Sequence, residues 1–323
     1  MKVIEHYSRA TEPLISFEII PPKRGGAVDK VFESLDKVMK YNPPFIDVTY
    51  HAAESYYEEL PDGTIKRHIK RKRPGTIGLC AAIKHKYDVD PVPHLICEGF
   101  TKEETEDALI ELNFLGIDNV LAIRGDANDD STPRIKNGTY NKYAIDLVKQ
   151  VKDMNRGEYL EDIVNAHETN FCVGVAGYPE KHFEAPNLDF DIARLKEKVD
   201  AGGDYIVTQM FFNNDAYFHF VEKCRAAGIE CPIVPGLKVL TRKRHLNFLP
   251  KFFHLNIPEA LSDEVQADPD NAREIGVEWA AQQCTELLEG GAPGIHFYIM
   301  GDPTPALDAV DKIPLGKTAK AGN

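Results

Sequence analysis

The chain has 323 residues, of which 43% are hydrophobic and 28% charged, and its net charge is -13 because 51 acidic side chains outnumber 38 basic ones. This acidic balance argues against general nucleic-acid binding, which needs lysine and arginine to replace phosphate counterions. No run approaches the ~20 apolar residues of a membrane-spanning helix, and residues 1–18 lack the apolar segment of a signal peptide. We therefore expect a cytoplasmic globular protein that binds neither nucleic acid nor membrane.

Short apolar runs recur along the chain and predict strands of a parallel sheet that is buried on both faces. They occupy residues 15–20, 45–50, 93–97, 120–124, 171–178, 205–211, 233–237 and 295–300. Helical periodicity is visible between several of them, at 28–39, 101–116, 192–199, 217–224 and 271–288. This alternation predicts an α/β fold, a (β/α)8 TIM barrel that occupies residues 1–323 as a single domain with loop insertions. The competing doubly wound sheet usually carries a GxGxxG motif, and neither that motif nor a P-loop occurs here.

Two probable insertions, residues 54–73 and 127–142, follow predicted strands and should therefore lie on the face where barrel active sites form. A third long connection spans 155–170. The segment 66–73 contains six lysine and arginine side chains. We expect it to be a solvated, mobile loop, with a contact to a polyanionic ligand as the alternative.

The six cysteines are scattered along the chain, without a CxxC motif or a zinc-finger spacing. This pattern predicts reduced thiols, most of them buried, and no metal site.

Polar groups follow nearly every predicted strand, at the carboxyl end where a barrel of this kind builds its active site. A barrel with a purely structural role would not require them. The side chains at these ends are Glu18, Thr49, Tyr50, His94, Arg124, Asp126, Tyr178, Gln209 and Tyr298.

Glu18 is flanked by apolar residues at the end of the first predicted strand. Desolvation there would raise its pKa toward the range useful for a general acid. A structural ion pair with an arginine is the alternative, and the residues alone favour neither.

The other strand-end groups allow two interpretations each. Arg124 could contact an anion, with Gly125 permitting close approach of a ligand, or it could form a salt bridge within the turn. His94 is by its spacing more typical of a packed histidine than of a catalyst. Gln209 could bind the edge of a heterocycle or fill a layer of the barrel. His182 lies in a predicted loop, where a phosphate contact is feasible.

Taken in order, the motifs at these strand ends resemble those of short, bacterial-type methylenetetrahydrofolate reductases that consist of the catalytic barrel. The resemblance covers residues 16 to about 300; each motif is weak alone, but their order is specific. The motifs are Ser-Phe-Glu at 16–18, Pro-Pro at 21–22, Asp-Val-Thr-Tyr at 47–50, Pro-His-Leu at 93–95, Ala-Ile-Arg-Gly-Asp at 122–126, Ala-Gly-Tyr-Pro-Glu at 176–180, Lys-Glu-Lys-Val-Asp-Ala-Gly at 196–202, Thr-Gln at 208–209 and His-Phe-Tyr at 296–298.

The resemblance implies a barrel that holds FAD and reduces 5,10-methylenetetrahydrofolate to 5-methyltetrahydrofolate with NADH or NADPH, by a ping-pong mechanism. It implies that Glu18 is the general acid, that Asp126 lies near the flavin and the folate, and that Gln209 contacts folate and nicotinamide in turn. It adds His245 and Tyr298 to the folate pocket. The flavin contacts that it implies are Thr49, Tyr50, Ala52, His94, Arg124, Gly125, Asp126, Ala144, Tyr178, His182, Ala185, Asp191 and Lys198. We also expect a homo-oligomer.

Some positions depart from the family pattern. Glu197 stands where those enzymes have an arginine, which Arg194 could replace. Asp302 stands in place of an arginine near the folate tail, Leu249 in place of an aromatic residue, and His245 in place of a glutamine. The chemistry should persist, whereas the preferences for substrate tail and nicotinamide need not.

Two other functions stay open. A pterin-dependent methyltransferase barrel would use a folate pocket without flavin. A flavin- or folate-binding barrel could also serve as a non-catalytic subunit of a redox complex.

Overall fold

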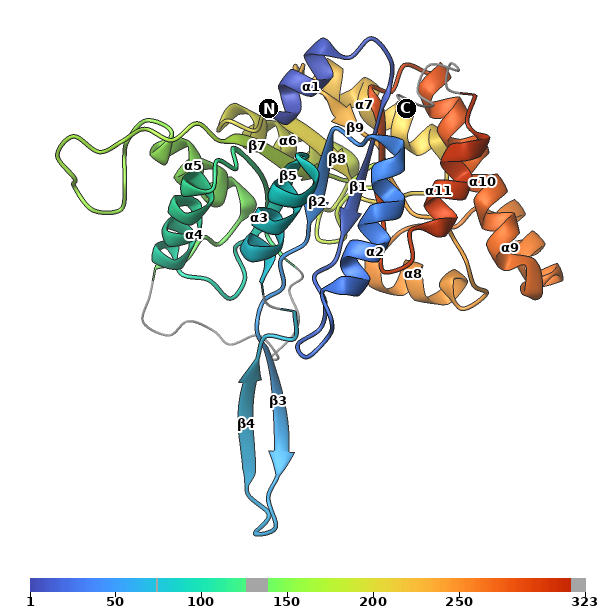
Figure 1. Ribbon diagram of the computed structural model, residues 1–323. Helices are drawn as coiled ribbons and strands as arrows, with labels where there is room; N and C mark the ends of the chain where they lie inside the picture. Colours follow the sequence, from blue (N-terminus) through green and yellow to red (C-terminus); the bar gives the residue numbers. More distant parts are fainter. Residues whose placement is uncertain (74, 126–138, 315–323) are drawn as a thin grey trace.

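The computed structural model describes residues 1–73, 75–125 and 139–314, and within them parallel strands form one closed sheet (Figure 1). The strands are β1 (Leu14–Ile19), β2 (Phe45–Val48), β5 (Asp90–Ile96), β6 (Asn119–Ile123), β7 (Cys172–Gly177), β8 (Tyr205–Thr208), β9 (Ile233–Val234), β10 (Gly236–Leu237) and β11 (Gly294–Tyr298). Their order is β10-β11-β1-β2-β5-β6-β7-β8-β9. Because only Pro235 separates β9 from β10, the two ends of this order meet and the sheet closes. The predicted (β/α)8 barrel and its eight predicted strands are confirmed.

Helices surround the sheet (Figure 1). They are α1 (Val3–Arg9), α2 (Asp29–Val38), α3 (Thr76–Tyr87), α4 (Lys102–Phe114), α5 (Ala144–Met154), α6 (Leu188–Asp200), α7 (Asn214–Ala226), α8 (His245–Phe253), α9 (Glu259–Ala267), α10 (Ala272–Glu289) and α11 (Thr304–Lys312), with short 3-10 turns at Met39–Tyr41 and Pro269–Asn271. The five segments with predicted helical periodicity are α2, α4, α6, α7 and α10. Thr101 and Glu104 form a reciprocal cap at the start of α4, with N–H···O distances of 3.0 and 2.8 Å.

The inside of the barrel changes from apolar to polar along the strands. At the amino ends of the strands, Phe45, Val92 and Tyr205 form a buried apolar cluster. Val3 of α1 belongs to the same cluster. Toward the carboxyl ends the inward positions of β1 are Ser16 and Glu18, while the residues between and beside them pack against the helices. A ligand site inside the barrel is therefore restricted to the carboxyl end.

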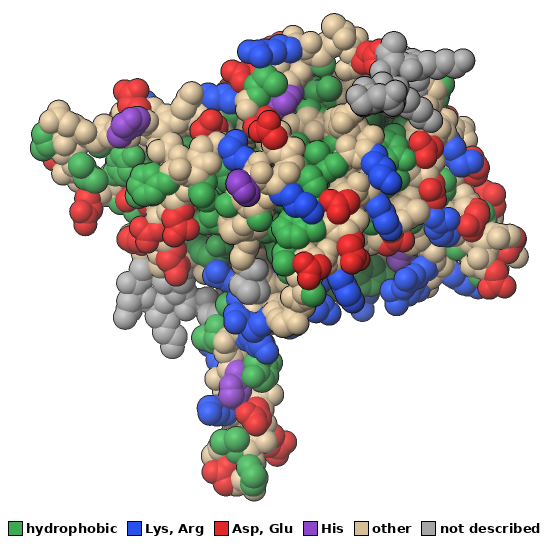
Figure 2. Space-filling view, viewed as in Figure 1, with side chains coloured by type: hydrophobic (Ala, Val, Ile, Leu, Met, Phe, Trp, Pro, Cys, Tyr) green, Lys and Arg blue, Asp and Glu red, His purple; other side chains and the backbone are tan. Residues whose placement is uncertain are grey.

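The first insertion forms an antiparallel hairpin of β3 (Glu54–Glu59) and β4 (Ile65–Lys70), which projects from the barrel mouth (Figure 1). The prediction of a mobile loop for 66–73 was wrong. Tyr56 stacks on His68 across the hairpin with ring centroids 4.8 Å apart, and Gly63 supplies the positive φ of 77° in the turn. Both faces of this ribbon are exposed (Figure 2), so its sequence lacks the alternation that marks a half-buried strand.

The second insertion is only partly described, since residues 127–138 lie outside the described ranges and 139–142 lead into α5. All six cysteines are free, and five of them are buried. Among the described helices, none combines the length and the apolar character that crossing a membrane requires.

Candidate active site

Three titratable side chains meet inside the carboxyl end of the barrel. Glu18 extends from β1, Asp47 from β2 and His94 from β5, and the parallel register sets Glu18 opposite Asp47. Nε2 of His94 lies 3.4 Å from Oε2 of Glu18 and 3.5 Å from Oδ1 of Asp47. The side chain of Glu18 is 12% exposed and that of Asp47 is 0% exposed, so Glu18 is the carboxyl group that a ligand at the mouth can reach.

The surroundings of Glu18 bring the pKa of its carboxyl group close to neutrality. Burial raises the pKa of Glu18 to about 7; His94 and Lys238 oppose this shift and Asp47 adds to it. Burial acts to lower the pKa of His94, but Glu18 and Asp47 together raise it above its ordinary value. The alternative of an ion pair with an arginine is not found: the basic group beside Glu18 is the imidazole of His94.

Asp47 was part of a quoted motif but was not predicted as a site residue. Neither of its carboxylate oxygens has a hydrogen-bond partner among the described residues, and the same holds for Nε2 of His94. A buried carboxylate without hydrogen bonds is unfavourable unless a nearby positive charge compensates it. Protonated His94, whose Nε2 lies 3.5 Å from Oδ1 of Asp47, would supply that charge. The sequence feature that could have identified Asp47 as a site residue is its position as a carboxylate within the apolar run of β2.

A second group of polar side chains lies around the ends of β6 and β7. The guanidinium of Arg124 binds both carboxylate oxygens of Glu184, at 2.7 and 3.0 Å. The backbone N–H of His182 donates to Asp191 at 2.8 Å. Lys198 of α6 donates from Nζ to the carbonyl of residue 176 at 2.6 Å, and burial lowers the pKa of Lys198 to about 8. The structure thus brings three predicted flavin contacts, Arg124, His182 and Lys198, to one side of the mouth, and burial lowers the pKa of His182.

The remaining predicted flavin contacts lie near these groups in the chain. Tyr178 packs edge-on against His182, with centroids 4.8 Å apart. Gly125 follows β6 with φ of 91°, Ala144 begins α5, and Ala185 is buried. Asp126, predicted to lie near flavin and folate, is outside the described residues.

Three further predicted contacts follow β2, and Gln209 follows β8. Thr49 is 8% exposed and its carbonyl accepts the hydroxyl of Thr76 at 2.9 Å. Tyr50 and Ala52 follow in the loop that enters the hairpin. Oε1 of Gln209 accepts the backbone N–H of the next residue at 2.9 Å, and no described residue accepts from its amide N–H groups.

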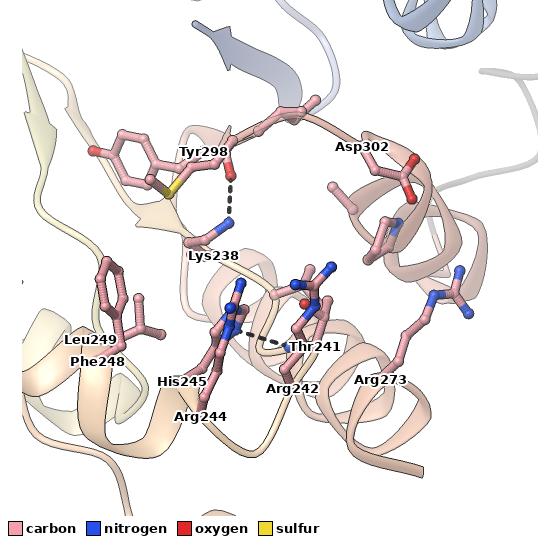
Figure 3. Close-up of a pocket in the computed structure, with 15 residues that line it drawn as sticks. Lys238, Thr241, Arg242, Arg244, His245, Phe248, Leu249, Arg273, Tyr298 and Asp302 are labelled. Atoms are coloured by element: carbon pink, nitrogen blue, oxygen red, sulfur yellow. Dashed lines mark hydrogen bonds between the residues drawn. The ribbon is translucent and has the colours of Figure 1, made fainter. Parts of the chain in front are cut away.

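Two of the predicted folate residues line a cavity of about 540 Å³ between the ends of β10 and β11, helix α8 and the start of α11 (Figure 3). His245 and Tyr298 face it, together with two of the departing positions, Leu249 and Asp302. Tyr298 is paired in register with Glu18. Lys238, another lining residue, donates to the carbonyl of Tyr298 at 3.4 Å. Glu18 is not among the residues that line the cavity, but Lys238 of its wall interacts electrostatically with Glu18.

Arg194, the expected replacement for the cation absent at position 197, pairs with Glu197 itself. Its guanidinium binds Glu197 at 2.8 Å on the exposed surface of α6 and lies over the ring of Phe190. Arg124 and Lys198 remain the predicted flavin cations on the β6 and β7 side of the mouth.

The family model for methylenetetrahydrofolate reductase matches residues 3–313. Among curated proteins, the chain is 31% identical to methylenetetrahydrofolate reductase (NADH) 1 of Arabidopsis thaliana, over 98% of this chain and 50% of that protein. It is 27% identical to 5,10-methylenetetrahydrofolate reductase of Pectobacterium carotovorum, over 88% of this chain and 85% of that protein. The chain spans about half the length of the plant relative and is close in length to the bacterial one.

The fold has a counterpart among solved structures. An uncharacterized protein from Clostridium thermocellum, described as binding two copies of 5-methyl-5,6,7,8-tetrahydrofolic acid, superposes with a TM-score of 0.58. The alignment covers 98% of this chain and 97% of that one at 15% sequence identity. At this identity the likeness concerns the fold alone.

Proposed function

The chain belongs to the methylenetetrahydrofolate reductase family, and we propose that it reduces 5,10-methylenetetrahydrofolate to 5-methyltetrahydrofolate with electrons from NADH or NADPH. The observation that carries the proposal is Glu18, held at the barrel mouth beside His94 and Asp47. Its pKa of about 7 suits an acid that protonates a substrate nitrogen near physiological pH.

FAD is the cofactor that we propose for this barrel, and the residues present fit it. A dinucleotide diphosphate needs cations where no glycine-rich loop is available. Arg124, His182 and Lys198 would hold that region; Glu184, whose side chain is 48% exposed, would release Arg124 to the ligand. When bound, FAD supplies the hydride exchange between nicotinamide and folate.

The side chains at the centre of the mouth donate the proton that the reaction requires and replace it afterwards. Glu18 holds it on its carboxyl group and donates it to the ring nitrogen that leaves as the imidazolidine ring of the substrate opens to an iminium. His94, with Nε2 at 3.4 Å, can return a proton to Glu18, and Asp47 stabilises the positive charge of that imidazole. The amide N–H groups of Gln209 orient a ligand, because its oxygen is already bound to the backbone.

The rate constant for folate reduction by the reduced enzyme should fall as the pH rises through about 7. Glu18 is the required acid, so the active fraction is complete below its pKa of about 7 and falls roughly tenfold per pH unit above it. Anaerobic stopped-flow with pre-reduced enzyme measures this profile. The rate constant for flavin reduction by nicotinamide, measured over the same pH range, should not show this decrease. A rate constant for folate reduction that does not change with pH would contradict the role of Glu18.

Replacing Lys198 with Met should weaken FAD binding by roughly 10- to 100-fold, because a charge-assisted hydrogen bond to an anion contributes about 1.5–3 kcal/mol. Fluorescence titration of the apoprotein with FAD gives the affinity, and a thermal melt of the same apoprotein reports its folding. Lys196→Met is the matched control, since Lys196 lies on the same helix but pairs with Asp200. Equal FAD affinities of the two variants would remove Lys198 from the cofactor site.

Anaerobic mixing of the purified protein with NADH, NADPH and then methylenetetrahydrofolate tests the function as a whole. We expect yellow protein that the nicotinamide bleaches and the folate reoxidises. Colourless protein that does not bind FAD but transfers a methyl group from 5-methyltetrahydrofolate would indicate a pterin-dependent methyltransferase. Flavin that is reduced but never reoxidised by the folate would indicate a binding subunit of a redox complex.

A further inference from the structure

Lys238 is an inward-facing lysine at the level of Glu18 in the barrel. It directly follows β10, two residues after Gly236, where a Cβ would stand 2.5 Å from the phenol oxygen of Tyr298. Because residues two apart on a strand point to the same side, Lys238 also faces the interior. The register of β10 and β11 sets it beside Tyr298, which is the register partner of Glu18. The lysine, the tyrosine and the acid therefore share one layer.

The ammonium group of Lys238 has no carboxylate bonded to it among the residues that the structure describes. Its Nζ donates to the backbone carbonyl of Tyr298 at 3.4 Å (Figure 3). The side chain is partly buried and lines the cavity. A buried positive charge is unfavourable unless a negative charge compensates it. The carboxyl group that acts on Lys238 is that of Glu18.

The other groups that face Glu18 from the described strands leave Lys238 as its counterion. Asp47 and His94 face it from β2 and β5, and Nε2 of His94 lies 3.4 Å from Glu18 and 3.5 Å from Asp47. The charge of a protonated His94 is balanced by the carboxylate of Asp47, so this pair has no net charge. Burial raises the pKa of Tyr298 well above its ordinary value, which keeps the phenol neutral. The positive charge that remains is that of Lys238.

The other basic side chains of the cavity do not take this place. Arg242, Arg244 and His245 line it together with Lys238. The two arginines are exposed to solvent. Burial and the neighbouring cations lower the pKa of His245 to about 4, so this imidazole is neutral near physiological pH. Of these four side chains, Lys238 is the one whose charge acts on Glu18.

We propose that Lys238 is a positioning residue for the acid, and that its ammonium group stabilises the carboxylate that Glu18 becomes when its proton passes to the substrate. This inference rests on the proposed function. The proton moves from the carboxyl oxygen of Glu18 to the lone pair of the leaving nitrogen, and the C–N bond breaks with its electrons remaining on that nitrogen. The negative charge then lies on Glu18, in the layer that holds Lys238. The ion pair exists only in this state, because a neutral carboxyl group carries no charge.

Lys238 is charged over the pH range in which Glu18 titrates. Burial raises the pKa of Glu18 to about 7 and lowers the pKa of Lys238 to about 8, and each group opposes the shift of the other. Lys238 therefore carries its proton on both sides of the Glu18 midpoint. Removing the charge of Lys238 should raise the pKa of Glu18 and make it a weaker acid.

The direct test is the titration of the Glu18 carboxyl group in the FAD-loaded protein without folate. Carbon-13 NMR of protein labelled at the glutamate carboxyl groups measures it, and Glu18→Gln identifies the resonance. Lys238→Met keeps the apolar stem, removes the charge and should raise the midpoint by about one pH unit. Lys238→Arg should restore the wild-type midpoint. Lys238→Gln, a second neutral variant, gives the same comparison if the methionine variant does not fold.

Lys243→Met is the matched control, because it removes the same charge from the same segment, while Lys243 is exposed and is not part of the cavity lining. It should leave the midpoint of Glu18 unchanged. In anaerobic stopped-flow, Lys238→Met should lower the rate constant for folate reduction at low pH roughly threefold, since proton transfer follows the strength of the acid. The decrease of this rate constant with pH should begin about one pH unit higher. Flavin reduction by NADH should stay unchanged.

The inference is overturned if Lys238→Met leaves the midpoint of Glu18 where it is, or if Lys243→Met moves it equally. Weaker folate binding by Lys238→Met with an unmoved midpoint would make Lys238 a ligand contact and would also overturn it. The NMR titration needs no turnover. A wild-type protein in which the midpoint depends on Lys238 but which does not reduce methylenetetrahydrofolate would overturn the proposed function and, with it, the role of this ion pair in catalysis.

Discussion

Replacing Glu18 with Gln should slow folate reduction by roughly 10²- to 10⁴-fold while reduction of the flavin by NADH or NADPH persists. Glutamine has nearly the same size and keeps a polar group at the end of β1, but its amide cannot donate an acidic proton. Glu18 is the more exposed of the two carboxyl groups that lie beside His94, so it is the one that a ligand can reach. The loss should therefore be confined to the step that opens the folate ring.

Anaerobic stopped-flow on the two half-reactions separates this role from a structural one. Nicotinamide-dependent bleaching of the flavin is the internal control, because it requires a folded, FAD-loaded protein but no acid for the folate. If both half-reactions slow by the same factor, Glu18 supports the architecture of the mouth and does not act as the acid. If neither slows, another group protonates the substrate.

Replacing Gly276 with Ala should destabilise the protein by at least about 3 kcal/mol. Gly276 lies on α10, and a Cβ at this position would stand 1.7 Å from the carbonyl oxygen of Leu240. The obstacle is backbone, which cannot rotate away as a side chain can. Alanine favours a helix over glycine by only about 1 kcal/mol, so the clash outweighs that gain.

The same change at Gly78 provides the control for Gly276. Gly78 is an exposed glycine of α3, and a Cβ there would have no neighbour within 4 Å. Gly78→Ala should leave the stability unchanged or raise it by about 0.4–1 kcal/mol. Urea unfolding of the apoproteins measures both variants, and a Gly276→Ala protein as stable as the wild type would show that α10 can move away from Leu240.

Gly276 also matters to the site, because Leu240 lies in the chain between Lys238 and Arg242. A shift of this backbone would move both cations relative to Glu18. A Gly276→Ala protein that still folds should therefore bind folate more weakly than the wild type. Calorimetric titration of the two proteins with 5-methyltetrahydrofolate would measure this difference.

The fold and the position of the site could be predicted from the sequence because both depend on local patterns. Apolar runs separated by helical periodicity are sufficient for a parallel barrel, and the carboxyl end of each strand is then the site by the geometry of the fold. Glu18 and His94 could be named in this way. The hairpin of β3 and β4 could not, because an exposed two-stranded ribbon buries neither face and leaves no alternating pattern.

The amino-acid sequence by itself determined the barrel, the order of its strands and the residues available at its mouth, since strand and helix periodicity and the types of strand-end residues are local properties. Only the tertiary structure decided which of these residues act on one another. Asp47, His94 and Glu18 come from three strands that are separated in the chain. They interact because Nε2 of His94 lies 3.4 Å from Oε2 of Glu18 and 3.5 Å from Oδ1 of Asp47 in a buried interior. The same holds for Arg242 and Arg244, which are ordinary exposed cations in the sequence. They line one cavity because the closed barrel sets the segment between β10 and α8 beside β11 and α11.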